Sequence, residues 1–113
     1  MEISQETIAP GKAVIRLQGK VMISEAPDRI GAAVEELVRA GTLFIVIDLS
    51  GVTALDSTGI GYLIAGYNRI MAASGEMRMA GATGHILQNF RVNQLDRVFA
   101  FYPSVDEAAK AEA

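Results

Sequence analysis

The first twenty residues alternate between apolar and polar positions in a way that predicts a β-hairpin. Residues 2–8 form a weakly patterned strand, and residues 13–20 alternate cleanly, with Ile15 and Leu17 on one face. Pro10 and Gly11 lie between the two segments and suit the central positions of a type II turn. We therefore expect one face of the hairpin to be covered and the face with Val14 to be exposed to water.

After the hairpin, the spacing of the apolar residues changes to a pattern that is typical of helices alternating with strands. Apolar residues at helical spacing from Ile30 to Val38 predict a first helix, with Ser24 as its N-cap and Gly41 at its end. The continuous apolar run at residues 43–47 is rich in β-branched side chains. It predicts a central strand that is buried on both faces.

A second helix is expected to begin at Ser57 or Thr58, because an apolar stripe runs at helical spacing from Ile60 to Met71. Shorter patterns follow it. They predict a strand at residues 77–80, a helix at 84–92, a strand at 98–101 and a terminal helix from 104.

The resulting order, β-β-α-β-α-β-α-β-α, predicts one α/β domain over residues 1–113. Strands that alternate with helices pair in parallel through right-handed crossovers, while the hairpin adds an antiparallel edge. We therefore expect a mixed sheet, with an N-terminal antiparallel hairpin followed by parallel βα units and helices packed mainly on one face.

Composition and charge exclude several classes of function. The chain has 113 residues, a net charge of −3 and no basic run, so we expect no direct binding of nucleic acid. It has no cysteine and one histidine, His85, which argues against disulfides and against thiolate or multi-histidine metal sites. No apolar run could span a bilayer and the N-terminus lacks a secretory signal, so we expect a cytoplasmic protein without membrane insertion.

The sequence motifs of common enzymes are missing. There is no G-x-x-x-x-G-K-[ST] loop, and Gly59-Ile60-Gly61 lacks the third glycine of a dinucleotide fingerprint because Ile64 stands there. A G-x-S-x-G nucleophile elbow is absent as well. His85 fits a surface or capping residue better than a member of a catalytic triad. We therefore expect no enzymatic activity, no cofactor and no metal.

Residues 48–61 carry the most informative polar pattern, at the expected start of the second helix. In one interpretation Asp56 or Ser57 is simply the helix N-cap, which stabilises the helix by about 1 kcal/mol. In the other, Ser57 is a phosphorylation switch. A phosphate there adds about −1.5 to −2 charges at a helix end that tolerates them. Gly59 and Gly61 would then keep the surrounding surface flat for a partner.

The hexapeptide at residues 56–61, DSTGIG, resembles the D-S-[ST]-G-[LI]-G signature of STAS domains of the bacterial anti-anti-sigma factor type, also called anti-sigma factor antagonists. Three other segments resemble the family pattern in the same order. They are FIVIDLSGV at residues 44–52, GEMRMAG at 75–81, and LDRVF followed by YPS within 95–104. The resemblance covers nearly the whole chain and implies a STAS-like fold.

The resemblance also implies a function. In such proteins the unphosphorylated form binds an anti-sigma factor, often a serine kinase of the histidine-kinase ATPase fold, and thereby frees a sigma factor. The kinase would phosphorylate Ser57, with Thr58 as second choice, and a phosphatase would reset the cycle. Homodimerisation is left open. The implied partner-binding residues are Asp56, Ser57, Thr58, Gly59, Ile60, Met22, Ile23 and Ser24.

One segment departs from the family pattern. Many members carry G-E-[LI]-D after the second strand, whereas Gly19-Lys20-Val21-Met22 stands here, so both acids are absent and one is replaced by a cation. This argues against the usual kinase, or for a partner with a different charge pattern. Met22 and Ile23 are either exposed apolar contacts or residues that pack under the first helix.

Two alternative functions stay open beside the switch. A STAS-like domain of this size also fits a scaffold subunit of a sensory assembly. A further alternative is an accessory STAS subunit of a membrane lipid-transport complex, although the signature around Ser57 argues weakly against that role.

Overall fold

The structure is a computed structural model that describes residues 1–22 and 28–110. Its strands are β1 (Glu2–Ala9), β2 (Lys12–Val21), β3 (Phe44–Leu55), β4 (Glu76–Ala80) and β5 (Ala100–Tyr102). Its helices are α1 (Arg29–Arg39), α2 (Ser57–Ala72), α3 (Gly84–Val92), the 3-10 helix η1 (Leu95–Arg97) and α4 (Val105–Lys110). The expected order of elements is confirmed, with η1 as an addition.

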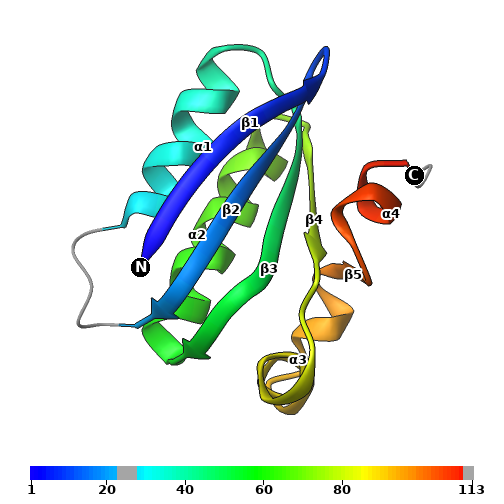
Figure 1. The fold of residues 1–113 in the computed structure, drawn as a ribbon. Helices are drawn as coiled ribbons and strands as arrows, with labels where there is room; N and C mark the ends of the chain where they lie inside the picture. The colour runs from blue at the N-terminus through cyan, green and yellow to red at the C-terminus, as the bar shows by residue number, and fades with distance from the viewer. Residues whose placement is uncertain (23–27, 111–113) are drawn as a thin grey trace.

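The strands form one mixed sheet in the order β1-β2-β3-β4-β5 (Figure 1). β1 pairs antiparallel with β2, and each later pair of neighbours is parallel. Gly11 in the turn between β1 and β2 has φ +75°, the left-handed conformation that a type II turn requires at its third residue. The predicted hairpin and the parallel units after it are therefore both confirmed.

Most of the core lies on one face of the sheet, where α1, α2 and α3 pack. The strands contribute inward residues such as Ile15, Ile47 and Met79, and the helices contribute residues such as Leu63 and Phe90. Figure 1 shows α1 and α2 behind the sheet and α4 on the other side. The prediction of helices mainly on one face is therefore confirmed.

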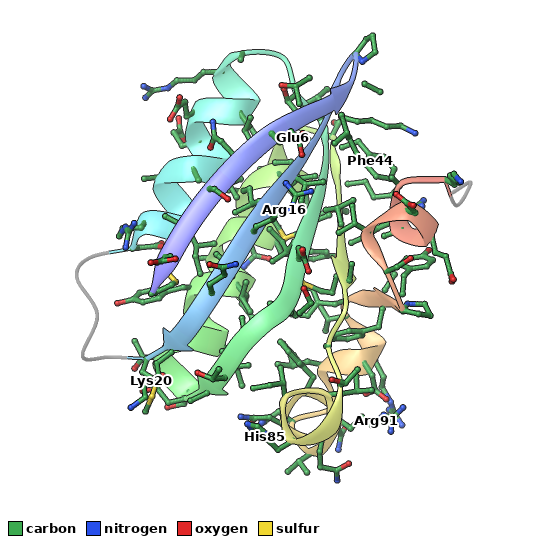
Figure 2. All side chains as sticks on the ribbon, viewed as in Figure 1. Glu6, Arg16, Lys20, Phe44, His85 and Arg91 are labelled. Carbon is green, nitrogen blue, oxygen red and sulfur yellow. The ribbon has the colours of Figure 1, made fainter. Side chains whose placement is uncertain are left out.

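The opposite face is covered in part by α4, which the hairpin pattern did not indicate. Val14 is 0% exposed and packs with Val46, Ala80 and Ala108. The expectation that the Val14 face of β2 is exposed to water is therefore wrong at this position. Further along β2 the face is polar, and Arg16 there pairs with Glu6 at 2.8 Å. Both side chains are labelled in Figure 2.

The start of α1 corrects the predicted N-cap. Asp28 caps this helix, because its Oδ1 accepts a hydrogen bond from the Gly31 N–H at 2.7 Å. Ser24 is therefore not the cap, since the helix begins at Arg29. Ser24 and Ile23 themselves lie outside the described residues.

The observed limits of three further segments differ from those that the sequence pattern predicted. β3 continues to Leu55 instead of ending near residue 47, because it stays paired with β2 as far as the Val21–Leu55 pair. β5 begins at Ala100 because the N–H groups of Val98 and Phe99 still donate back to the Leu95 carbonyl of η1. The apolar stripe of α2 ends at Ile70, since Met71 is 47% exposed.

Two cations hold α4 on the sheet. Arg78, which is 2% exposed, donates from a terminal guanidinium nitrogen to the Ala108 carbonyl at 2.9 Å and pairs through Nε with Glu76. Lys12 Nζ donates to the Ala109 carbonyl at 3.0 Å. Both cations also lie over the Phe44 ring. Because the last carbonyls of a helix lack partners within it, these two bonds stabilise the end of α4.

We predict that Arg78→Ala lowers the free energy of unfolding by about 3 kcal/mol, because it leaves a buried carbonyl unpaired and removes packing under α4. The control is Arg69→Ala, which removes a half-exposed arginine on α2 that pairs with Glu35. Exposed ion pairs contribute less than about 1 kcal/mol. Urea denaturation measures both variants, and equal losses would contradict a buried role for Arg78.

Candidate functional site

The candidate site lies where β3 leads directly into α2. Asp56 joins the two elements with an extended backbone, and its N–H donates to the Val21 carbonyl of β2 at 3.3 Å. Its Oδ1 accepts a hydrogen bond from the Gly59 N–H at 2.8 Å. Asp56 is therefore the N-cap of α2, and of the two residues that the sequence offered as caps it is the one used.

Ser57 is the first residue of α2 and its side chain is exposed. Its hydroxyl makes no hydrogen bond to any residue in the described ranges, since Asp56 occupies the capping role. Thr58, the second candidate hydroxyl, is half-buried. A group added to Ser57 would therefore leave the cap of α2 intact.

Gly59 is buried against the end of β2 and does not form a flat outer surface. A Cβ at this position would overlap the Val21 carbonyl oxygen and lie 2.9 Å from Leu55 Cδ1. Ile60 is also buried, at 7% exposed. Gly61 is exposed, with open space where a Cβ would stand. The expected flat surface is thus wrong for Gly59, whose missing side chain permits close packing inside the domain.

The end of β2 lies beside the start of α2. Lys20 pairs in register with Ala54 and Val21 with Leu55. Lys20 is exposed at this end of the strand, as Figure 2 shows, and Met22 is half-buried. The structure therefore brings Met22 close to the Asp56 segment. Ile23 and Ser24, the other predicted partner residues of this loop, lie outside the described part of the chain.

Sequence reasoning missed the contribution of α3 to the site. Asn89 donates from Nδ2 to the Leu55 carbonyl at 2.8 Å, which ties α3 to the last residue of β3. His85 at the start of α3 lies 3.0 Å from the Thr53 carbonyl through Nε2. One sequence feature could have indicated this contribution. Asn89 and Asn93 are four residues apart and therefore lie on one face of a helix.

A groove of about 310 Å³ opens beside Ser57, between α2 and α3. Its lining residues come from α2, from α3 and its C-cap, and from η1. They are Ser57, Ile60, Ile64, Asn89, Asn93 and Leu95. The site therefore consists of an exposed hydroxyl at the edge of a groove that has uncharged walls.

The STAS domain model matches residues 4–108. The chain belongs to the STAS domain family. Among residues 1–22 and 28–110, no cluster of three His, Asp or Glu side chains is placed to hold a metal ion. No helix in the same ranges is long and apolar enough to cross a membrane.

Solved STAS structures share this fold over nearly their whole length. An anti-sigma factor antagonist from Mycobacterium paratuberculosis is 27% identical, with a TM-score of 0.78 over 96% of this chain and 92% of that one. Unphosphorylated SpoIIAA is 17% identical, with a TM-score of 0.73 over 96% and 94%. SpoIIAA of Bacillus has also been solved in its phosphorylated form.

A sulfate transporter family protein from Wolinella succinogenes is 9% identical, with a TM-score of 0.71 over 91% of this chain and 85% of that one. No curated protein matches this STAS domain significantly in sequence. The fold is therefore that of the STAS anti-sigma factor antagonists, and the sulfate transporter family protein shares it.

We predict opposite effects for two glycine substitutions two residues apart in α2. Gly59→Ala should lower the free energy of unfolding by about 2 kcal/mol or more, because the new methyl group overlaps the Val21 carbonyl. Gly61→Ala should raise it by about 0.5–1 kcal/mol, because it stiffens the unfolded chain at an open position. Urea denaturation of both variants is the measurement, and a neutral Gly59→Ala would contradict the close packing.

Proposed function

We propose that this STAS domain is an anti-sigma factor antagonist that is switched by phosphorylation at Ser57. The unphosphorylated form binds an anti-sigma factor and so frees a sigma factor. Ser57 carries the proposal, because it is an exposed hydroxyl at the start of α2 that the cap does not use. The similarity to the Mycobacterium antagonist supports the same function.

The partner in this proposal is an anti-sigma factor that is also a serine kinase of the histidine-kinase ATPase fold. It transfers the terminal phosphoryl group of ATP to Ser57 Oγ, and a phosphatase later removes it. SpoIIAA, which has the same fold, exists in both forms, so the fold accommodates the modification. A phosphate at Ser57 would also lie at the positive end of the α2 dipole, where it does not destabilise the helix.

Release of the partner would follow from local repulsion. Buried residues along α2, including Leu63 and Ile70, fix the helix on the sheet. Asp56 and Gly59 fix its first turn through the cap and the contact with Val21. The phosphate therefore changes the charge at the interface and leaves the domain as it is. A phosphate buried against a partner without a counter-charge costs several kcal/mol.

The proposed partner surface combines the start of α2 with the loop that follows β2. Ser57, Thr58 and Met22 present side chains there, and Ile23 and Ser24 belong to the same proposal. Asp56, Gly59 and Ile60 take part through the backbone geometry that they set. Lys20 gives this surface a cation where many relatives have an acid, so the partner should differ in charge at the opposing position.

The role of an accessory subunit in membrane transport has weaker support. The neighbour from the sulfate transporter family is 9% identical, so the likeness extends to the fold alone. Affinity capture from the source cell separates the functions, because each implies a different class of partner.

We predict that the anti-sigma factor kinase recovered from the source cell adds one phosphate to the wild-type chain, at Ser57. Ser57→Ala should abolish labelling and keep the fold, since the cap is Asp56. Thr58→Ala removes the second candidate hydroxyl and should still be labelled at Ser57. Mass spectrometry locates the phosphate. Persistent labelling of Ser57→Ala would refute the assignment of the acceptor.

We also predict that Ser57→Asp weakens binding of the anti-sigma factor about a hundredfold, which corresponds to about 2.8 kcal/mol. Amide chemical shifts should change only around residues 54–62 and near the end of β2, and the melting temperature should move by only about 2–4 °C. Asn68→Asp adds the same charge to an exposed position further along α2 and should bind like wild type. Shifts spread across the sheet would show a global rearrangement instead.

A further inference from the structure

The groove between α2 and α3 is continuous with the phosphoacceptor, because Ser57 is one of its lining residues. A partner that covers Ser57 therefore also covers the opening of the groove. What the groove can receive depends on its floor, its walls and the charge near its opening. The inference below rests on the proposed function and specifies the chemistry of the partner contact.

The floor of the groove is apolar and carries no charge. Ile60 is buried, while Ile64 and Leu95 are half-buried and pack against the main core. Val92, at 68% exposed, lies three residues after Asn89 and therefore on the same side of α3. The lining of the groove itself is apolar at Ile60, Ile64 and Leu95. Such a surface favours an aliphatic guest over a charged one.

The walls of the groove are held in place before any partner binds. Asn89 is bonded to the Leu55 carbonyl, and Phe90, next to it in α3, is 0% exposed. Asn93 donates from Nδ2 to the Asn89 carbonyl at 2.8 Å and to Asn89 Oδ1 at 3.1 Å. Its own Oδ1 accepts no hydrogen bond from any residue that the structure describes. A groove with fixed walls binds a guest without paying for their ordering.

We propose that this groove receives an aliphatic side chain of the anti-sigma factor, with Asn93 Oδ1 accepting a hydrogen bond from a neighbouring backbone N–H of the same partner segment. The apolar contact and the phosphoacceptor then form one surface. A phosphate on Ser57 adds about −1.5 to −2 charges at the opening of the groove. No lining side chain offers it a counter-charge. Insertion of an aliphatic group would strip water from the phosphate, so the modified form rejects the guest.

A second groove on the molecule provides an internal comparison. It has a volume of about 640 Å³ and lies at the β5 edge, with Leu87, Arg91 and Phe101 among its lining residues. Ser57 does not line it. Figure 2 shows Arg91 on the outer side of α3. A guest in this second groove would be insensitive to phosphorylation at Ser57, and the two sites are therefore distinguishable.

The absence of native cysteine allows the groove to be filled after folding. Asn93→Cys and Met71→Cys each introduce one thiol at an exposed position, on the groove and at the far end of α2 respectively. Both variants are modified with N-cyclohexylmaleimide, and binding of the purified anti-sigma factor is measured before and after. We expect modification at position 93 to weaken binding at least tenfold and modification at 71 to change it less than twofold. Unchanged binding after modification at 93 would overturn the proposal.

A second experiment tests the groove without the anti-sigma factor. The ¹⁵N-labelled chain is titrated with N-acetyl-leucine methylamide, and amide shifts are followed. We expect shifts at Ile64, Asn93 and Leu95 that weaken at least threefold in phosphorylated protein or in Ser57→Asp. Shifts centred on Leu87 and Phe101, or no shifts at all, would overturn the groove as an aliphatic site.

The two experiments distinguish a wrong assignment of the groove from a wrong proposed function. If the anti-sigma factor binds wild type and is indifferent to modification at position 93, the groove assignment is wrong and the function stands. If no anti-sigma factor binds wild type, the proposed function fails, and the anti-sigma factor is excluded as the occupant.

Discussion

The geometry of the site depends on one close contact, in which the first turn of α2 lies directly on the end of β2. Gly59 makes this possible, because any side chain there would overlap the Val21 carbonyl. The same carbonyl accepts a hydrogen bond from the Asp56 N–H. The strand end, the helix start and the link between them are thus fixed by a few backbone atoms. Ser57 is held at one place on the surface as a result.

The helix cap and the proposed phosphoacceptor are adjacent residues. Asp56 accepts the hydrogen bond from the Gly59 N–H. The Ser57 hydroxyl therefore makes no hydrogen bond to any residue in the described part of the chain. If Ser57 were the cap, its modification would remove a bond that the helix needs and would couple the switch to stability. With the cap on Asp56, a phosphate alters the charge of the surface while the buried residues of α2, such as Leu63, keep the helix in place. This arrangement favours a switch that acts at the interface.

The sequence predicted the elements better than their contacts. The periodic patterns gave the hairpin, the stripe of α2 and the parallel order, because these depend on residues close in the chain. Coverage of Val14 by α4 depends on Arg78 and Lys12, whose carbonyl partners lie far along the chain, so no local pattern indicated it. The hydrogen bond from Asn89 to the Leu55 carbonyl, which shapes the site, joins residues that are 34 positions apart. It was not predicted for the same reason. At α1 the sequence pattern indicated Ser24 as the cap, whereas Asp28 is the cap in the structure because its carboxylate accepts a hydrogen bond from the Gly31 N–H.

The charge distribution of the site explains how recognition and release could use the same surface. The groove has no charged lining residue. Ion pairs mainly accelerate encounter, whereas desolvated apolar contacts mainly slow dissociation. In the proposed complex, an uncharged groove thus makes the lifetime depend on excluding water beside Ser57. A phosphate opposes that exclusion directly, because water is the main source of solvation for it there. One modification can therefore end a contact that no ion pair maintains.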